Sequence, residues 1–486
     1  MNSIRPHTMD TLCLVAPHPD VLAKLREELG TARESADSSA AASLFTLHTP
    51  QIFGLDDGTI LPPSEFALGA ELAEVRTAAA TRPPLRGNLN VLVVLAQFQD
   101  VPLHRSAAEF ETLFFGPGAG SVHEFYSEAS GGLVGITGKV VGPFTLPRNL
   151  ADYANGAAGM GNAAPNAQTM AFDAAQLALA NVNATLDNDG NGFVDAFIVV
   201  HAGPGGEVTN NKSDIWSHKW VLPGNGITAA DGTRVYAYLT VPEDARLGVC
   251  AHELGHLLFG WPDLYDLDYS SEGIGNWCLM SGGSWNGSTV GALQGDIPAH
   301  PSAWCKATQG WVNVVVQNHN EQVTIDDVHS SRTIYRLWKD GGTASEYFLV
   351  ENRQRKGFDR AIPGDGLLIW HIDDSMPSNT NESHYHVALV QADGRRDLER
   401  AANFGDDSDP FPGTAQNATF DAQSTPSSLA YSGLPTSVAV TSIPPSSASM
   451  TVHLAVTNAS APPPHHHVAL PPTPPAPTLP IHDAFA

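Results

Sequence analysis

The stretch CAHELGHLLFGWPDLYD, residues 250–266, carries two histidines, a glutamate and two aspartates among apolar neighbours. His252 and His256 are four residues apart, so on a helix their side chains share one face and can bind one metal ion. Imidazole nitrogens favour zinc, and zinc lowers the pKa of a bound water toward about 7. Glu253 lies about 100° around the helix from His252, where it can take a proton from that water without binding the metal. The spacing predicts metal-assisted hydrolysis of an amide or peptide bond.

The residues that follow predict where this helix ends and where a third ligand lies. Gly260 can adopt the left-handed conformation that ends a helix, and Pro262 prevents the helix from continuing. Two histidines alone hold zinc weakly, so a third ligand is needed. The outgoing loop offers two candidates, Asp263 and Asp266.

Apolar runs around the motif predict an α+β domain over residues 86–315. LNVLVVLAQF (89–98) and AFIVVHAG (196–203) are typical of buried strands, and NAQTMAFDAAQLALANV (166–182) of an Ala-rich buried helix. Residues 1–85 form a leading segment in which PDVLAKLREELG predicts a short helix that stops at Gly30.

Residues 316–456 differ in character from the preceding region. Short segments rich in β-branched and aromatic residues, such as EYFLVENR and GLLIWHID, are separated by Gly, Pro, Asn and Asp, which predicts a β-sandwich. Residues 457–486 are Pro-rich and cannot bury a core, so we expect a disordered tail.

Charge and hydropathy exclude some classes of partner. The formal net charge of -26 argues against nucleic acids and anionic membranes as partners, because binding to either needs a positive surface. No apolar run approaches the roughly 18 residues of a membrane span. The start, MNSIRPHTMD, shows no basic and apolar regions of a secretory signal.

Beyond the motif, the sequence resembles a known family. HELGHLLFGWPDLYD followed by NWCLMSGGSW is similar to the immune inhibitor A family of secreted bacterial zinc metalloproteases, relatives of the metzincins. The segments LNVLVVLAQFQD, FFGPGAGSVHEFYSEASGG, DNDGNGFVDAFIVVHAGPG, EYFLVENRQ and GDGLLIWHID also resemble family segments, in their usual order. The resemblance implies a metzincin-like catalytic domain and secretion.

Position by position, the resemblance implies roles for four residues. His252 and His256 would be zinc ligands, Glu253 the general base and acid, and Met280 the methionine of the Met-turn beneath the metal. The metzincin pattern has its glycine three residues after the second histidine, whereas Gly260 comes four after His256.

This departure bears on the third ligand. The GxxD spacing is kept between Gly260 and Asp263, which favours Asp263 as the third zinc ligand. Asp266 is the alternative, because one extra residue in the last helical turn can rotate Asp263 away from the metal.

A second metal site is predicted in DNDGNGFVD, residues 187–195. Oxygen-bearing side chains stand at loop positions 1, 3, 5 and 9 of an EF-hand-type pattern, namely Asp187, Asp189, Asn191 and Asp195. Ile198 stands at position 12, so the bidentate glutamate is missing. We predict an incomplete, structural calcium loop, with a metal-free turn as the alternative.

Cys13 opens CLVAPHPD, well upstream of the motif, and loosely resembles the propeptide cysteine of matrix metalloproteases. A thiolate is a strong zinc ligand, so residues 1–85 are a candidate inhibitory pro-segment with Cys13 as its latency ligand. The alternative is an inert cysteine, which is the common state of a lone thiol.

The leading functional prediction is a zinc endopeptidase that hydrolyses protein substrates through a water activated by Glu253. A binding or adhesion protein with a vestigial metal site is the alternative. The intact trio with Met280 argues against it. A zinc-dependent hydrolase of a non-peptide amide also fits the motif. His218 and Tyr265 are open candidates for stabilising the oxyanion.

Overall fold

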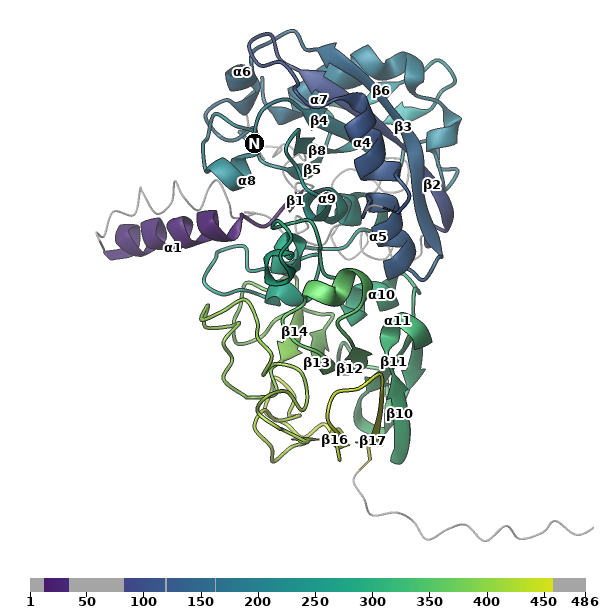
Figure 1. The fold of residues 1–486 in the computed structure, drawn as a ribbon, viewed down its shortest axis with the longest axis vertical. Helices are drawn as coiled ribbons and strands as arrows, with labels where there is room; N and C mark the ends of the chain where they lie inside the picture. The colour runs from purple at the N-terminus through teal and green to yellow at the C-terminus, as the bar shows by residue number, and fades with distance from the viewer. Residues whose placement is uncertain (1–12, 35–82, 119, 162, 458–486) are drawn as a thin grey trace, which may run out of the picture.

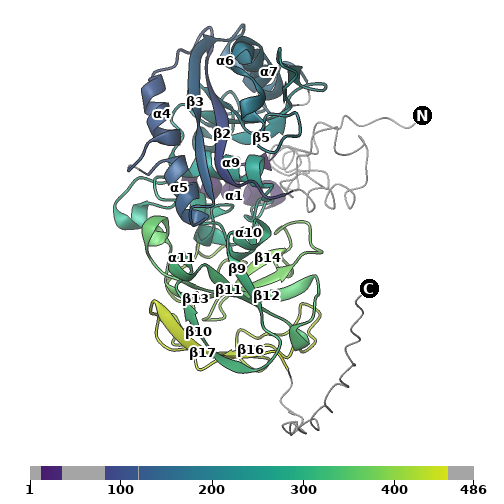
Figure 2. The same ribbon diagram turned by 90° about the vertical axis from the view of Figure 1, so that its right-hand side faces the viewer.

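The computed structural model describes residues 13–34, 83–118, 120–161 and 163–457 (Figure 1). It has two parts, an upper one with a large mixed sheet and a lower one with two smaller sheets (Figures 1 and 2). The α+β character predicted from the sequence is confirmed. The predicted tail, apart from its first residue, lies outside the described residues, as do residues 1–12 and 35–82 of the predicted pro-segment.

The upper sheet has six strands in the order β1-β5-β8-β4-β2-β3. In that order they are Cys13–Leu14, His218–Val221, Ala237–Pro242, Phe197–His201, Gly87–Gln97 and Val134–Thr145. Strands β3, β2, β4 and β8 are parallel, whereas β5 runs antiparallel to β8 and β1 antiparallel to β5. An N-terminal strand thus completes the edge of a sheet that is otherwise built from residues 87–242.

Helices cover both faces of this sheet because its central strands are apolar on both sides. On β2, Val91, Val93 and Leu95 belong to one core and Leu92, Val94 and Ala96 to another. The first core includes α4 (Ala107–Phe115), α5 (Val122–Ala129) and α9 (Leu247–Phe259), and the second includes α6 (Leu150–Ala154) and α7 (Ala167–Ala178).

The strands and the helix predicted around the motif are confirmed, with shifted ends. Residues 89–98 lie almost entirely in β2, residues 197–201 form β4, and the helix predicted over 166–182 is α7 followed by a 3-10 turn, Leu179–Asn181. The expected stop at Gly30 is wrong, because α1 spans Pro19–Glu34. A glycine costs a helix only about 1 kcal/mol, so it need not end one.

The lower part contains a five-stranded and a four-stranded sheet, in the orders β14-β13-β12-β11-β9 and β10-β17-β16-β15. The first consists of Val387–Val390, Gly366–Asp373, Glu346–Arg353, Thr333–Leu337 and Asn313–Val316. The second consists of Glu321–Asp326, Ser449–Ala455, Ala439–Thr441 and Thr419–Phe420. A third core, which includes Val350, Ile369 and Val452, lies between them. Two sheets around one core are what a β-sandwich requires, but that assignment stays a prediction.

The five-stranded sheet is buried on both faces. On β12 and β13, Phe348, Val350 and Ile369 point into the third core, whereas Leu349 and Trp370 belong to the first core together with α9. The run LLIW in the segment GLLIWHID is apolar throughout because its successive residues point alternately into one core and into the other. The domain boundary predicted at residue 315 falls inside β9, the edge strand of this sheet.

Short elements complete the chain. They are the helices α8 (Gly206–Thr209), α10 (Ala303–Thr308) and α11 (Val328–Ser331), the hairpin of β6 (Ile227–Thr228) and β7 (Arg234–Val235), and the 3-10 turns Ala184–Leu186, Gly275–Trp277, Gly282–Trp285, Ser288–Val290, Lys339–Gly341 and Gly357–Ala361. Within the described ranges, no helix has the length and apolar character that crossing a bilayer requires.

Candidate metal centre

Helix α9 positions the three polar residues of the motif in the interior. All thirteen of its residues are buried, and it ends where Gly260 takes the left-handed conformation with φ of 62°. The N–H of Gly260 donates to the carbonyl of His256 at 3.0 Å. The chain then reverses through Trp261 and Pro262, which brings Asp263 back toward the helix.

The side chains of His252, His256 and Asp263 converge on one point. The two Nε2 atoms lie 3.0 Å apart, and each lies 3.1 Å from Oδ1 of Asp263. Tetrahedral zinc with bonds of about 2.0–2.1 Å separates neighbouring ligand atoms by about 3.3 Å. This triangle therefore fits a zinc ion with little adjustment, and two imidazoles with a carboxylate are a donor set that zinc accepts.

Backbone carbonyls set the tautomer of both histidines. Nδ1 of His252 donates to the carbonyl of Leu279 at 2.9 Å, and Nδ1 of His256 donates to the carbonyl of Trp261 at 2.5 Å. A carbonyl only accepts, so each proton resides on Nδ1 and each Nε2 keeps its lone pair for a metal. Burial lowers the pKa of His256 to about 4, which keeps its imidazole neutral.

Asp263 is charged in this setting. Burial alone would raise the pKa of its carboxyl, but the neighbouring His256 and His252 lower it. Its second oxygen, Oδ2, is buried and accepts no hydrogen bond from the described residues. A buried acceptor without a donor is costly, and a bound cation would remove that cost.

Asp266 does not join this triangle. Its Oδ2 accepts hydrogen bonds from the backbone and the hydroxyl of Ser271 at 2.9 and 2.7 Å, and from Ser270 at 3.0 Å. Asp266 thus orders the loop that follows Asp263. Of the two aspartates considered from the sequence, the structure brings Asp263 to the histidines and leaves Asp266 outside.

Glu253 lies beside the triangle with both carboxyl oxygens buried. Neither oxygen accepts a full hydrogen bond from the described residues, and the backbone N–H of Val15 comes near the carboxyl. Burial raises the pKa of Glu253 well above its ordinary value, and the charge of Asp263 adds to this. A carboxyl of raised pKa beside a metal triangle has the properties of a general base that later acts as an acid.

Met280 packs against helix α9. It is fully buried, and a Cβ added to Gly255, the residue before His256, would lie 2.9 Å from its sulfur. The carbonyl of Met280 accepts from the backbone of Leu264 at 2.7 Å, which ties this turn to the loop that carries Asp263. The turn therefore supports both sides of the triangle.

An N-terminal segment, residues 13–18, covers the site. Cys13 and Leu14 pair with Lys219 and His218 on β5, and Val15 donates to the carbonyl of Ser217 at 3.2 Å. Val15 is fully buried, and its N–H approaches Glu253 closely enough to lower the pKa of that carboxyl slightly. The extended chain thus runs from the sheet edge across Glu253.

Polar side chains around the site bind the carbonyls of this segment. The hydroxyl of Tyr265 donates to Leu14 at 3.1 Å, and the indoles of Trp216 and Trp285 donate to Val15 and Ala16 at 3.0 and 2.9 Å. Sequence reasoning chose Cys13 within this segment and missed its backbone. The signal available was the apolar run LVA ending at Pro17, which favours an extended conformation.

Two candidates from the sequence remain, His218 and Cys13. His218 contacts the hydroxyl of Tyr238 at 2.9 Å and the carbonyl of Trp216 at 2.6 Å, so both its ring nitrogens are engaged away from the triangle. The backbone of Cys13 lies in β1, but its thiol is outside the described part of the structure.

The DNDGNGFVD loop gathers three carboxylates. Asp187, Asp189 and Asp195 each offer an oxygen, and these oxygens lie within 4.8 Å of one another. Backbone N–H groups of Gly190 and Gly192 donate to Asp187 at 2.8 Å each. Gly192 has a φ of 88°, the conformation that the sharp turn of such a loop needs.

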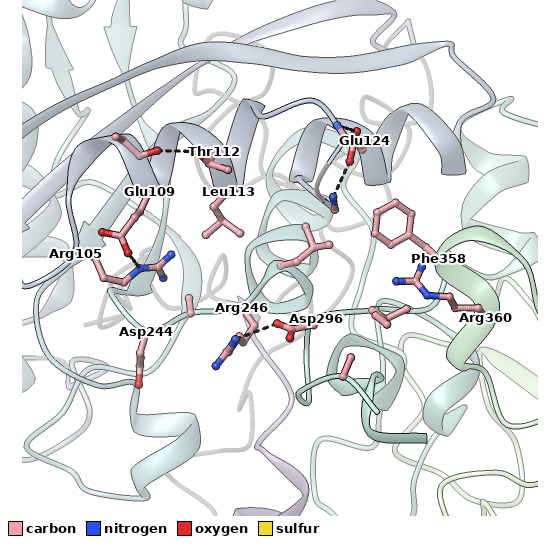
Figure 3. A pocket seen from close by; sticks show the side chains of 17 residues that line it. Arg105, Glu109, Thr112, Leu113, Glu124, Asp244, Arg246, Asp296, Phe358 and Arg360 are labelled. Atoms are coloured by element: carbon pink, nitrogen blue, oxygen red, sulfur yellow. Dashed lines mark hydrogen bonds and ion pairs between the residues drawn. The ribbon is translucent and has the colours of Figure 1, made fainter. Parts of the chain in front are cut away.

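A groove of about 1220 Å³ opens elsewhere on the upper part (Figure 3). It lies between α4, the start of α5, the start of α9 and the 3-10 turn Gly357–Ala361, and charged pairs line it, such as Arg246 with Asp296 at 3.2 Å. The groove is separate from the triangle: its lining does not include His252, Glu253, His256 or Asp263.

Comparison with known proteins places part of the chain beside a family of peptidases. Residues 95–312 match the family described as "Immune inhibitor A peptidase M6, catalytic domain". The chain is 34% identical over 230 residues to an immune inhibitor A of Bacillus thuringiensis subsp. alesti, which covers 40% of this chain and 33% of that protein. It is 29% identical over 256 residues to the pre-pro-metalloprotease PrtV of Vibrio cholerae serotype O1 (strain M66-2), covering 45% and 27%.

These matches define the class of the upper part as a metallopeptidase domain. Within that class, residues 95–312 match the catalytic domain of the immune inhibitor A family, and the resemblance seen in the sequence is confirmed. The chain spans a third or less of the length of the curated relatives it matches.

Proposed function

We propose that the chain is a zinc-dependent endopeptidase that hydrolyses peptide bonds of protein substrates and is exported from the cell. The observation that carries this proposal is the triangle of His252, His256 and Asp263 with Glu253 beside it. A vestigial site in a binding protein would not need a glutamate whose two buried oxygens lack full hydrogen bonds, which costs stability.

The roles of the residues follow from their atoms. Nε2 of His252, Nε2 of His256 and Oδ1 of Asp263 hold the zinc ion, which when bound supplies a Lewis acid and lowers the pKa of water. Glu253 takes a proton from the attacking water and passes it to the leaving amine nitrogen. Its raised pKa suits the second step, because a protonated carboxyl must persist long enough to act as an acid.

The N-terminal segment supports an inhibitory role for residues 1–85. Its antiparallel pairing with β5 gives it the extended form that a peptide substrate adopts when it adds a strand to a sheet edge. The peptide bond between Leu14 and Val15 has its carbonyl bound by Tyr265 and its N–H near Glu253. We propose that the segment occupies the place of the substrate, and that Tyr265 binds the scissile carbonyl of a substrate in the same way.

This backbone contact stands beside the Cys13 hypothesis as a second route to latency. In the thiolate route, Cys13→Ser activates the full chain. In the backbone route, Val15→Asp activates it, because a new carboxylate buried beside Glu253 expels the segment. If both variants remain latent, the proposal that residues 1–85 inhibit the enzyme is wrong.

The test of the enzymatic proposal uses this activated background. Full-length Val15→Asp, with and without Glu253→Gln, is compared in casein digestion and in zinc content. We expect equal zinc in both, and at least a hundredfold lower digestion with Glu253→Gln, since proton transfer contributes about 10²–10⁴-fold. Asp263→Ala should lose zinc, whereas Asp266→Ala should keep it. Equal digestion with and without Glu253 would refute the mechanism.

We further propose that calcium binds the 187–195 loop and stabilises it. The clustered oxygens of Asp187, Asp189 and Asp195 support this, since three carboxylates without a cation repel one another. Calcium should raise the thermal midpoint of the wild type but not of Asp187→Asn. Asp231→Asn is the matched control, because Asp231 accepts backbone hydrogen bonds nearby without joining the cluster. A calcium shift that survives Asp187→Asn would contradict the site.

A further inference from the structure

Arg353 is a fully buried arginine on β12, in the lower part of the molecule. On this strand, Leu349, Glu351 and Arg353 share the face that is turned toward the upper part, because alternate residues point to opposite sides. Its guanidinium therefore enters the metallopeptidase domain from outside the residues that match the family.

The guanidinium binds two carbonyls of that domain. Nη1 donates to the carbonyl of Trp277 at 2.8 Å, and Nη2 donates to the carbonyl of His300 at 2.8 Å. Asp359 holds the other edge of the guanidinium at 2.7 and 2.8 Å, a bidentate pair with fixed geometry. The same carboxylate accepts the N–H of His300 at 2.8 Å.

Both carbonyls lie next to Leu279, the residue whose backbone binds His252 of the triangle. The N–H of Leu279 donates to the carbonyl of His300 at 3.3 Å, beside the guanidinium. The carbonyl of Leu279 in turn accepts the Nδ1 proton of His252. Arg353 and His300 thus clamp the turn of Trp277 to Leu279, and this turn sets both the tautomer and the aim of a metal-binding imidazole.

We infer that Arg353 is a positioning residue for the zinc site, through which the lower part holds the turn that orients His252. The inference rests on the proposed zinc site. It gives the lower part a role in catalysis that does not require it to contact the substrate.

The test measures zinc affinity on the full-length chain. Arg353→Lys keeps the charge but cannot reach two carbonyls and a carboxylate in one plane. We expect it to weaken zinc binding about tenfold, since groups that orient metal-binding histidines contribute 10–100-fold to affinity. The visible spectrum of the cobalt-loaded protein should change with it, because this spectrum reports the geometry around the metal.

Arg332→Lys is the matched control. Arg332 also crosses between the two parts and donates to backbone carbonyls, to Trp311 at 2.6 Å and to Gly131 at 3.1 Å, but it does not contact the 277–279 turn. It should lower the thermal midpoint of the metal-free chain without changing the zinc dissociation constant by more than twofold. An unchanged dissociation constant and cobalt spectrum in folded Arg353→Lys would overturn the inference.

A measurement on the wild type covers the case in which Arg353→Lys does not fold. Coupling between two sites is reciprocal, so zinc binding must stabilise β12 if β12 supports zinc binding. Amide hydrogen exchange at residues 351–353 should slow on addition of zinc, more than exchange at residues 332–334. If zinc slows exchange in α9 and leaves β12 unchanged, the inference is wrong. A wild type that binds no zinc contradicts the proposed function instead.

Discussion

Gly255 lies where helix α9 meets the turn that carries Met280, and its missing side chain leaves room for this methionine. A Cβ at this position would approach the sulfur of Met280 to 2.9 Å and the ring of Trp261 to 3.1 Å. Both distances are shorter than ordinary van der Waals contact, and neither neighbour is free to move in a close-packed interior.

We therefore expect Gly255→Ala to lower the free energy of unfolding by about 1–3 kcal/mol, the usual cost of overpacking. Chemical denaturation of the metal-free chain measures this. The double variant Gly255→Ala/Met280→Ala is the control, since removing the long side chain opens space for the new methyl group. If the two losses simply add in the double variant, Met280 is not the source of the strain.

Local spacing made part of the site predictable from the sequence. His252, Glu253 and His256 lie on one helix, where four residues make about one turn, so their relation needs no tertiary information. The relation of Asp263 to the histidines depends on how the chain reverses after Gly260, which spacing alone left open between Asp263 and Asp266. Val15 and Arg353 are distant in sequence from the motif, and only the folded chain brings them to the site.

At the scale of elements, the N-terminal segment is secured by α1. Arg26 on this helix forms an ion pair with Glu272 and donates to the carbonyls of Tyr269 and Ser271 at 2.8 and 2.7 Å. These groups follow Asp266 on the loop beyond the metal triangle. The helix thus fastens the segment to the loop that also carries Asp263.

We expect Arg26→Ala to raise the basal hydrolysis of a quenched peptide by the full-length chain about tenfold, the equivalent of about 1.4 kcal/mol of lost attachment. Lys24→Ala is the matched control, because Lys24 is exposed on the same helix. Equal rates for Arg26→Ala and the wild type would show that α1 does not hold the segment in place.

Strands with a simple pattern were predictable, and the sheet order was not. The apolar runs of β2 and β4 identify buried strands, but β1 has two residues and no periodicity to recognise. Its position at the sheet edge comes from pairing with β5, about two hundred residues later in the chain, which local sequence does not encode.

At the scale of the whole molecule, a histidine on α11 links pH to the joint between the two parts. Burial lowers the pKa of His329, but the hydrogen bond to Asp327 and the ion pair with Asp359 at 3.3 Å outweigh this and raise the pKa to about 9. Lys306 and His300 also face this ring. The protonated imidazole is therefore preferred in the folded chain.

The raised pKa gives the pH dependence a definite sign. The stabilising contribution is complete below the unfolded pKa of about 6.5 and is lost as pH rises through about 9, with an upper limit of about 3 kcal/mol. We expect the difference in unfolding free energy between wild type and His329→Gln to shrink between pH 6.5 and 10. A difference that stays constant over this range would contradict the assignment.

The five-stranded sheet has an apolar layer on each side, and this sets the smallest piece of the chain that can be isolated. Cutting the gene after residue 312, where the match to the peptidase family ends, leaves Leu349 and Trp370 on one fragment and exposes the surface they cover on the other. We expect both fragments to expose a large apolar surface to solvent and therefore to aggregate. The domain recognised by sequence comparison is thus smaller than the part of the chain that we expect to stay soluble. A soluble fragment must include the C-terminal sheets.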